Sequence, residues 1–317
     1  MDGQTGALRV AQNLSFSVSH RHFSHLFPCW PLGLLNASDP RCMKAADQWY
    51  HAAMAGPWTT PSTSGDWCLW SMAVLSSLST LMGRREESWS NLTAAAYRHV
   101  MPSMTPFGSA LLSNSMCKRT RRSLLQLLSP VTFGWASTDG EGCNNENGNS
   151  EVGKQGPCGD PTGETPFAIA SALQDSMLVT DRAAGHVRVF AGVPASAPPM
   201  SFHELLAEGG FLISAARKHG VTSFVHIRST ATGHSQLRID PGLGPGGVAA
   251  QCDGSPCGDS ALQHADGTVT VSFAAANTTA LLLPAGGSAA AAVVKPAAPE
   301  AEYENWWGCK EGKSAGH

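Results

Sequence analysis

The chain has 317 residues and a mass of 33.2 kDa, with a formal net charge of −3 and 14% charged residues. That weak and mixed charge disfavours nucleic-acid binding, because no basic stretch is interleaved with the aromatic residues on which bases stack. No apolar run approaches the roughly 20 residues needed to cross a bilayer, so neither nucleic acid nor a membrane is predicted as a partner.

The first half of the chain is expected to be helical. Within residues 42–54, apolar residues recur near i, i+3, i+4 and i+7, and an Asp-Pro pair before them supplies a helix start. A second helix is expected to follow residues 62–66 and to end at Gly83, and a third to span about 89–100. Helices that each carry one apolar stripe pack as a layer against other helices.

The second half changes character. Residues 138–163 are rich in Asn, Gly and Pro without an apolar period, which predicts a loop or insertion, and a helix is expected from Pro166 to Val179. Short stretches with β-branched residues then predict a small antiparallel β domain. The expected strands are residues 186–193, 221–229, 236–240, 268–273 and 279–283. The predicted division is a helical domain at 1–185, a β domain at 186–295 and a tail at 296–317.

The nine cysteines form neither zinc-type CxxC pairs nor a compact disulfide framework. Cys252 and Cys257 are close enough in sequence to bridge a loop, and free thiols fit them about as well. Four N-x-[ST] sequons suit a secreted glycoprotein, but so short a triplet also recurs by chance. They begin at Asn13, Asn36, Asn91 and Asn277. The sequence therefore leaves the cellular compartment open.

The most informative segment is residues 20–27, with the sequence HRHFSHLF. It holds three imidazoles and a guanidinium within six positions, beside two aromatic rings. Imidazoles are costly to bury without partners, and an arginine offers five fixed donors suited to a rigid array of oxygens. The segment therefore predicts a polar site for sugar hydroxyls or a carboxylate. His22 and His25 do not predict a metal site, because no nearby acidic residue or cysteine completes a ligand set.

The pattern HRHxSHL resembles a signature of the glycoside hydrolases of family 95, whose members include α-L-fucosidases. The order of later segments is similar to that family as well, from about residue 17 to about residue 230. These segments are Gly65-Asp66-Trp67, Leu81-Met82-Gly83, GETPFAIA at 163–170, HVRVFAGVP at 186–194 and SFHELLAEGGFLISA at 201–215. The resemblance implies a mixed fold, helical then all-β: the later helices of an (α/α)6 barrel followed by a small antiparallel β-sandwich.

The resemblance also implies a reaction, the hydrolysis of terminal α-L-fucosides or related L-galactosides with inversion and without a cofactor. A fucosylated glycan would be the substrate. Arg21 and His22 fall where the family contacts the sugar, and His25 and Trp67 are the other candidate substrate-binding residues. Glu164 occupies the position of the family's Asp, one methylene longer, and would orient or deprotonate water.

Inversion also needs a protonated carboxyl on the other face of the sugar, roughly 6.5 to 9.5 Å from the base. In the family this acid lies in an S-P-E-N segment upstream of HRHxSHL, and an N-x-N pattern further upstream assists the base, but neither is found before residue 20 of this sequence. The chain is therefore expected to be a C-terminal portion with low or no activity alone.

No other carboxylate is a credible acid. Glu86 and Glu87 are expected in a surface turn, and Glu141 and Glu146 lie in the predicted insertion. Glu204 is expected at the surface or in the contact between the two domains.

Each candidate residue also has a structural interpretation. His22 and His25 would bridge helix ends, Arg21 would form a salt bridge between domains, and Glu164 would stabilise a helix N-terminus. Trp67 would fill the core. The competing function is a non-catalytic carbohydrate-binding protein that retains Arg21 and His22 without the reacting pair of carboxyls.

Overall fold

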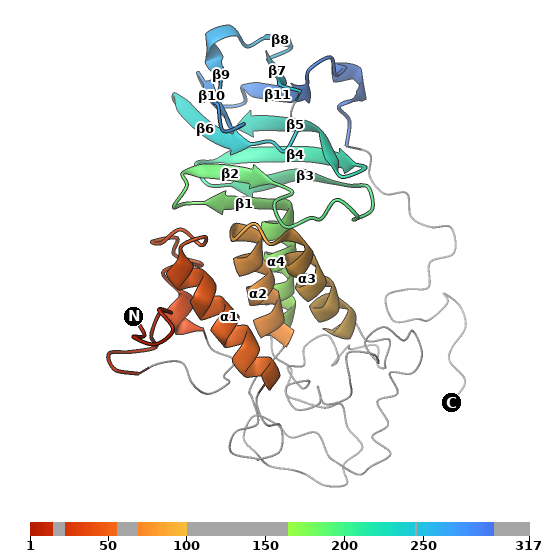
Figure 1. Ribbon diagram of the computed structural model, residues 1–317. Helices are drawn as coiled ribbons and strands as arrows, with labels where there is room; N and C mark the ends of the chain where they lie inside the picture. Colours follow the sequence, from red (N-terminus) through yellow and green to blue (C-terminus); the bar gives the residue numbers. More distant parts are fainter. Residues whose placement is uncertain (15–22, 56–68, 100–163, 245, 295–317) are drawn as a thin grey trace, which may run out of the picture.

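The structure is a computed structural model that describes residues 1–14, 23–55, 69–99, 164–244 and 246–294. A layer of helices lies against one side of a pair of β-sheets (Figure 1), so the predicted order of helices followed by strands is confirmed. Completion of an (α/α)6 barrel stays a prediction. Among the described helices, none is both long and apolar enough to pass through a bilayer.

Within the described residues, the helical layer contains one short 3-10 turn and four α-helices. They are η1 (Ser24–Leu26), α1 (Pro40–Ala55), α2 (Leu69–Leu81), α3 (Arg85–His99) and α4 (Glu164–Met177). Helix α1 begins where the Asp-Pro pair predicts, because the backbone N–H of Arg41 donates to Asp39 Oδ1 over 2.8 Å and so caps the helix. Proline is favoured at the first helical position, since the N–H that it lacks would have no partner inside the helix.

Helix α2 is the centre of the layer. Its small hydroxyl residues are buried along with its aliphatic ones, and α3 and α4 approach it closely at alanines. The buried polar residues are Ser71, Ser76, Ser77, Ser79 and Thr80. Two of them are satisfied across the helix contact, because Ser88 Oγ on α3 lies 2.7 Å from Thr80 Oγ1 and 3.1 Å from Ser76 Oγ. The helices thus hold each other by hydrogen bonds as well as by apolar packing.

The third helix begins earlier than predicted, at Arg85, so Glu86 and Glu87 lie in its first turn and not in a surface turn. Carboxylates are stabilised there because the first N–H groups of a helix carry partial positive charge. Glu87 also accepts a hydrogen bond from Ser79 Oγ over 2.8 Å. Arg84, just before the helix, pairs with Asp47 and joins α1 to this corner.

Helix α4 also differs from the prediction, because it ends at Met177 and not at Val179. Leu178 and Val179 belong to strand β1 (Leu178–Asp181), which follows the helix without a connecting loop. Both residues are buried, so their apolar character continues the helical period although the backbone has already become extended. Strand β1 pairs with β2 (His186–Val189), and this hairpin spans the expected domain boundary between residues 185 and 186.

The β region is a two-sheet sandwich. One sheet has the order β1-β2-β6-β10-β9 and the other β3-β4-β5-β11-β7-β8. All neighbouring strands are antiparallel except β2 and β6, which are parallel. The remaining strands are β3 (Met200–Ala207), β4 (Phe211–Lys218), β5 (Val221–Ser229), β6 (Ser235–Asp240), β7 (Val248–Cys252), β8 (Ser255–Pro256), β9 (Ala261–Gln263), β10 (Val269–Phe273) and β11 (Thr279–Pro284). Short 3-10 turns, η5 (Gly258–Ser260) and η6 (Ala289–Ala291), complete the region.

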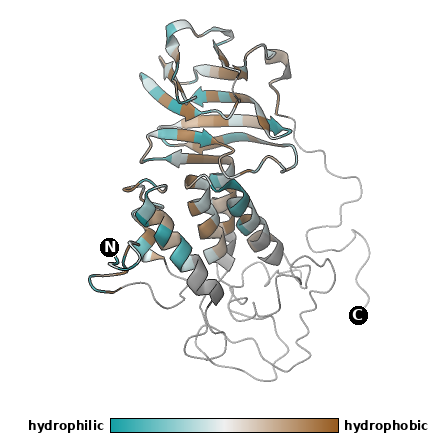
Figure 2. Cartoon of the chain, viewed as in Figure 1, coloured by the Kyte–Doolittle hydropathy of each residue, from teal (hydrophilic) through white to brown (hydrophobic). Residues whose placement is uncertain are grey.

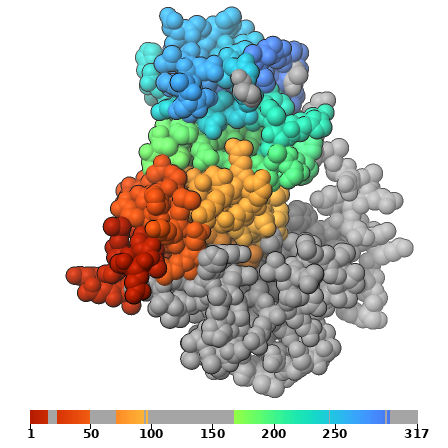
Figure 3. Space-filling model, viewed as in Figure 1, coloured from red at the N-terminus to blue at the C-terminus, as the bar shows by residue number. Residues whose placement is uncertain are grey.

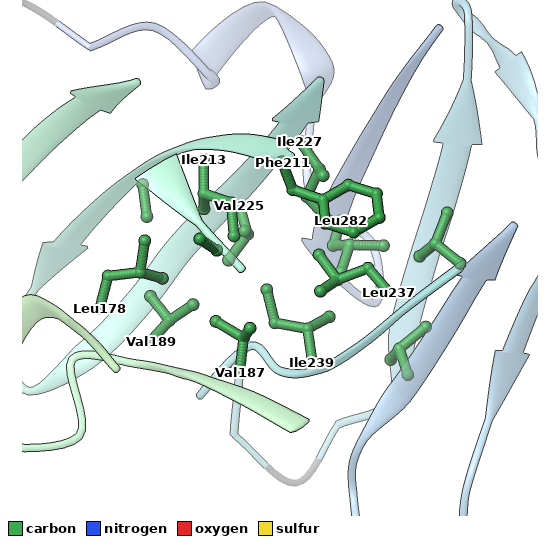
Figure 4. Close-up of a cluster of buried hydrophobic side chains, with 14 of the residues drawn as sticks. Leu178, Val187, Val189, Phe211, Ile213, Val225, Ile227, Leu237, Ile239 and Leu282 are labelled. Atoms are coloured by element: carbon green, nitrogen blue, oxygen red, sulfur yellow. The ribbon is translucent and has the colours of Figure 1, made fainter. Parts of the chain in front are cut away.

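Aliphatic side chains from both sheets fill the interior of the sandwich. Figure 4 shows Val187, Val189 and Ile239 from the first sheet pointing toward Ile213 and Val225 of the second. Strands β2 and β10 alternate strictly between buried and partly buried residues, as a sheet with one covered face requires. Figure 2 shows this alternation as brown and teal bands along the strands.

The strands predicted near 221–229, 236–240, 268–273 and 279–283 are confirmed, with shifts of one residue at some ends. The strand predicted at 186–193 is wrong at its end, because Phe190 adopts a left-handed backbone with φ of 51° and stops β2 at Val189. The sequence pattern does not predict strands β1, β3, β4, β7, β8 and β9. Strand β3 contains a bulge between Phe202 and Leu205, where Glu204 has φ of 51°, and this breaks the alternation that reveals a strand.

The chain after β2 turns back onto the end of α4. The N–H groups of Phe190 and Gly192 donate to the carbonyls of Met177 and Ser176 over 2.7 and 3.0 Å. A Cβ on Gly192 would lie 2.8 Å from Ser88 Oγ and 2.9 Å from Ser176 Cα, so only glycine permits this approach. The helices and the β1 side of the sandwich therefore meet in a continuous packed seam, which Figure 3 shows at the change from orange to green.

Candidate functional site

Most of the predicted site residues lie where their surroundings are not described. Arg21, His22 and Trp67 fall outside the described residues. Glu164 is the first residue of α4, so its place along the backbone is known but not the position of its side chain. The proposal that Glu164 meets Arg21 and His22 at one cavity therefore stays a prediction.

His25 is the one predicted site residue whose surroundings the structure describes. It lies in the η1 turn and is 6% exposed. Burial lowers the pKa of its imidazole to about 4, so the ring is neutral at pH 7. So little exposed surface suits a residue that holds the segment in place more than one that contacts a sugar.

An aromatic cluster anchors the same segment. The ring centroid of Phe23 lies 5.3 Å from that of Phe27, 5.7 Å from that of Trp30 and 5.4 Å from that of Trp49 on α1. These spacings are those of favourable offset and edge-to-face aromatic contacts. The disulfide between Cys29 and Cys42 ties the same loop to the start of α1. The two residues before Phe23, Arg21 and His22, are thus joined directly to a rigid anchor.

The described residues also form a cavity of about 250 Å³ at the seam between the helices and the sandwich. Its walls come from the loop at 29–37, the end of α4, the β1–β2 hairpin and the end of β3. Arg182 lies at this cavity, and its Nε donates to Glu208 Oε1 over 2.6 Å while Nη1 donates to the carbonyl of Pro31 over 3.4 Å. The backbone of Gly33, at φ of 61°, allows the close passage of the Arg182 side chain.

Asp175 on α4 supplies the cavity with its most perturbed carboxyl. Burial raises its pKa to about 6, against the opposing effect of the nearby Ser77 hydroxyl and the Trp30 side chain. Its Oδ2 is buried and has no hydrogen-bond partner among the described residues, and Ser77 Oγ likewise lacks one in good geometry. The carboxyl is therefore partly protonated near pH 6, because burial disfavours its charged form more than Ser77 and Trp30 stabilise it.

The seam cavity is distinct from the predicted catalytic position. Asp175 comes 11 residues after Glu164 on the same helix, which at 1.5 Å per residue places them about 16 Å apart along the axis. The two residues thus belong to opposite ends of α4. The sequence motifs do not mark Asp175, although its spacing from Ala168 and Ala172 puts a carboxyl on the buried stripe of this helix.

The pH dependence of stability provides a test of the Asp175 environment. Because its folded pKa of about 6 lies above the unfolded value of 3.8, the folded state binds the extra proton and stability falls as pH rises between these values. The loss from pH 4 to pH 7 is on the order of 3 kcal/mol. Asp175→Asn removes this contribution, so its stability relative to wild type, measured by urea unfolding, is expected to rise by that amount over the same pH range. An unchanged difference at the two pH values would contradict the assignment.

Two exposed glutamates of the β region, Glu204 and Glu208, are paired with arginines. Glu204 accepts a hydrogen bond from Arg228 Nη2 over 2.6 Å, which is the main cause of its lowered pKa, and Glu208 pairs with Arg182. Both are exposed residues of the β region, as predicted for Glu204. Within the described ranges, no group of three or more His, Cys, Asp or Glu side chains is arranged to hold a metal ion.

No protein-family model matches this chain, and no curated protein matches it either. Among solved structures, the chain is similar to a GH127 β-L-arabinofuranosidase from Geobacillus stearothermophilus T6, with 10% sequence identity and a TM-score of 0.30. The alignment covers 82% of this chain and 41% of that one, so the chain spans less than half the length of the enzyme it matches. At this identity and TM-score the likeness assigns neither a family nor an activity to the chain.

Proposed function

We propose that this chain is part of a glycoside hydrolase that resembles family 95 and hydrolyses terminal α-L-fucosides, or related L-galactosides, with inversion. Arg21 and His22 hold hydroxyls of the terminal sugar. Glu164 orients or deprotonates the attacking water. A carbohydrate is the substrate, and no cofactor takes part.

The observation that carries the proposal is the start of α4 at Glu164. The first N–H groups of a helix carry partial positive charge, which favours the ionised form of a carboxyl at that position. An ionised carboxylate is what a base for water activation needs. The glutamate that the resemblance selects therefore occupies a place on the backbone that suits this role.

A second observation supports the sugar-binding role of the HRHFSHLF segment. Phe23 contacts the aromatic rings of Trp30 and Trp49, and the buried His25 fixes the next turn. A binding residue is effective when the structure around it is already ordered before the ligand arrives. His22 and Arg21 lie one and two residues before Phe23 of this anchor.

The alternative is a carbohydrate-binding protein without catalysis. It is favoured by the ion pairs of Glu204 with Arg228 and of Glu208 with Arg182, because a carboxylate paired with an arginine is held in its ionised form and cannot donate a proton as a general acid. Hydrolysis and binding are separated by offering an α-L-fucosyl disaccharide and following both fucose release and the thermal shift caused by L-fucose.

Release of β-L-fucose as the first product, observed by NMR before mutarotation, supports an inverting hydrolase. Both this chain and the chain with any in-frame upstream sequence of its gene are assayed. Binding without release from either supports the alternative. If neither fucose release nor a thermal shift with L-fucose or L-galactose is observed, the hydrolase and the binding-protein hypotheses are both wrong.

A further inference from the structure

The four sequons differ sharply in their surroundings. Asn36 lies in an exposed loop, and Asn277 lies in the exposed connection between β10 and β11. Asn91 is 8% exposed inside α3, and its sequon hydroxyl, Thr93 Oγ1, donates back to the carbonyl of Trp89 over 2.7 Å. Asn13 is exposed, but its sequon partner Ser15 lies outside the described residues.

The two exposed sequons share a second property, because each lies beside a disulfide. Asn36 is inside the loop closed by Cys29 and Cys42. Near Asn277, the sequon residue Thr279 donates through N and Oγ1 to Asp253 Oδ1, next to the bridge between Cys252 and Cys257. Disulfides form and persist in oxidising compartments, which in eukaryotic cells include the one where glycans are attached to asparagine. Of the two alternatives for Cys252 and Cys257, a disulfide or free thiols, the structure has the disulfide.

The local geometry at both asparagines leaves the reacting atom out of the described contacts. Asn36 Oδ1 accepts hydrogen bonds from Ser38 N and Oγ over 2.9 and 2.7 Å. Asn277 Oδ1 accepts one from Arg228 Nη1 over 3.4 Å. Asn277 also has φ of 64°, a left-handed conformation that asparagine tolerates better than most residues, and it lies where the chain crosses from β10 of one sheet to β11 of the other. None of these hydrogen bonds uses Nδ2, the atom to which a sugar is attached.

We infer that Asn36 and Asn277 carry N-linked glycans and that the protein passes through a secretory compartment. In the transfer, Asn Nδ2 attacks C1 of the first sugar of a lipid pyrophosphate-linked oligosaccharide. The new C1–N bond forms as the C1–O bond to pyrophosphate breaks. The amide loses one proton to a base of the transferase, and the lipid pyrophosphate leaves.

Asn91 is not expected to carry a glycan, because its side chain is buried. A glycan on a side chain packed inside the helical layer cannot be solvated without separating α3 from its neighbours. Chains modified at Asn91 would not fold and would be missing from the folded, secreted protein. The inference therefore distinguishes two sites that are occupied from one that is not.

The experiment secretes the full chain, behind a signal sequence, from a eukaryotic cell line, and maps occupied sites by enzymatic deglycosylation in H₂¹⁸O with peptide mass spectrometry. Asn36 and Asn277 are expected to become ¹⁸O-labelled aspartate, and the peptide with Asn91 to stay unlabelled. Unmodified Asn36 and Asn277 in the folded, secreted chain would overturn the inference, as would occupancy of Asn91.

Matched variants separate the sequon from the fold. Ser38→Ala and Thr279→Ala are each expected to lower the mass of the secreted protein by one glycan. Ser38→Thr and Thr279→Ser keep the sequon and are expected to keep the glycan. An unchanged mass in the alanine variants would contradict the assignment even if the protein folds normally.

Discussion

Glu164→Gln is expected to lower kcat for fucose release by about 10²- to 10⁴-fold, because the amide cannot take a proton from the attacking water. KM is expected to change little, since Gln has nearly the same shape and the sugar contacts are assigned to Arg21 and His22. The measurement is release of fucose from an α-L-fucosyl disaccharide by the chain together with the in-frame upstream sequence of its gene. Full activity in the variant would remove Glu164 from its proposed role.

Glu164→Asp is the informative control for this prediction. It shortens the side chain by one methylene and restores the residue type that family 95 has at this position, so the carboxylate is kept and only its reach changes. Activity closer to wild type than that of Glu164→Gln is expected. Equal losses in both variants would indicate that the position matters for structure and not for proton transfer.

Trp49→Ala is expected to destabilise the helical layer by about 3 to 5 kcal/mol, the usual cost of removing a large buried aromatic side chain. Trp49 is fully buried on α1, where it packs among residues of η1, α1 and α2 and contacts the ring of Phe23. Urea unfolding followed by far-ultraviolet circular dichroism measures the loss. If the anchor orders Arg21 and His22, the same variant also weakens the thermal shift caused by L-fucose.

Two controls define the origin of the loss. Trp49→Phe keeps a ring beside Phe23 and is expected to cost less than the alanine variant, while Leu34→Ala removes a side chain that is 72% exposed and is expected to cost little. A loss below about 1 kcal/mol for Trp49→Ala would mean that this cluster does not support the layer.

The sequence predicts the helices well where one face is apolar and a cap marks the start. Helix α1 follows an Asp-Pro pair and carries an apolar stripe, so both its type and its start can be inferred. The end of α4 cannot, because Leu178 and Val179 continue the apolar period although they are in a strand. Periodicity reports burial, and a buried strand that follows a helix directly gives no separate signal.

The missed strands have a similar physical explanation. Strand β3 carries a bulge at Glu204, and its solvent-facing residues include the apolar Leu206, which is 61% exposed. Neither feature fits the strict alternation by which β2 and β10 are recognised. Tertiary pairing with β4 determines this strand, and pairing between segments is not visible in a local pattern.

For the candidate site, the sequence selects residues by motif but not by surroundings. His25 is chosen as a polar ligand-binding residue, and the structure shows that it is buried with a neutral ring. The sequence does not single out Asp175, because its pKa is raised by burial in the assembled fold, against the effect of Ser77 and Trp30, which are distant in sequence and become neighbours only there. Perturbed acidity is a property of the assembled environment and not of a residue type.

The direct passage from α4 into β1 has a mechanical consequence. A helix and a strand without a hinge between them transmit displacement, since rotation of the helix must tilt the strand to which it is joined. The contacts of Phe190 and Gly192 with the end of α4 stiffen this junction further. A displacement at Glu164, at the opposite end of α4, would thus change the angle of β1 in its sheet. Because no loop separates α4 from β1, this junction also offers a protease no exposed linker.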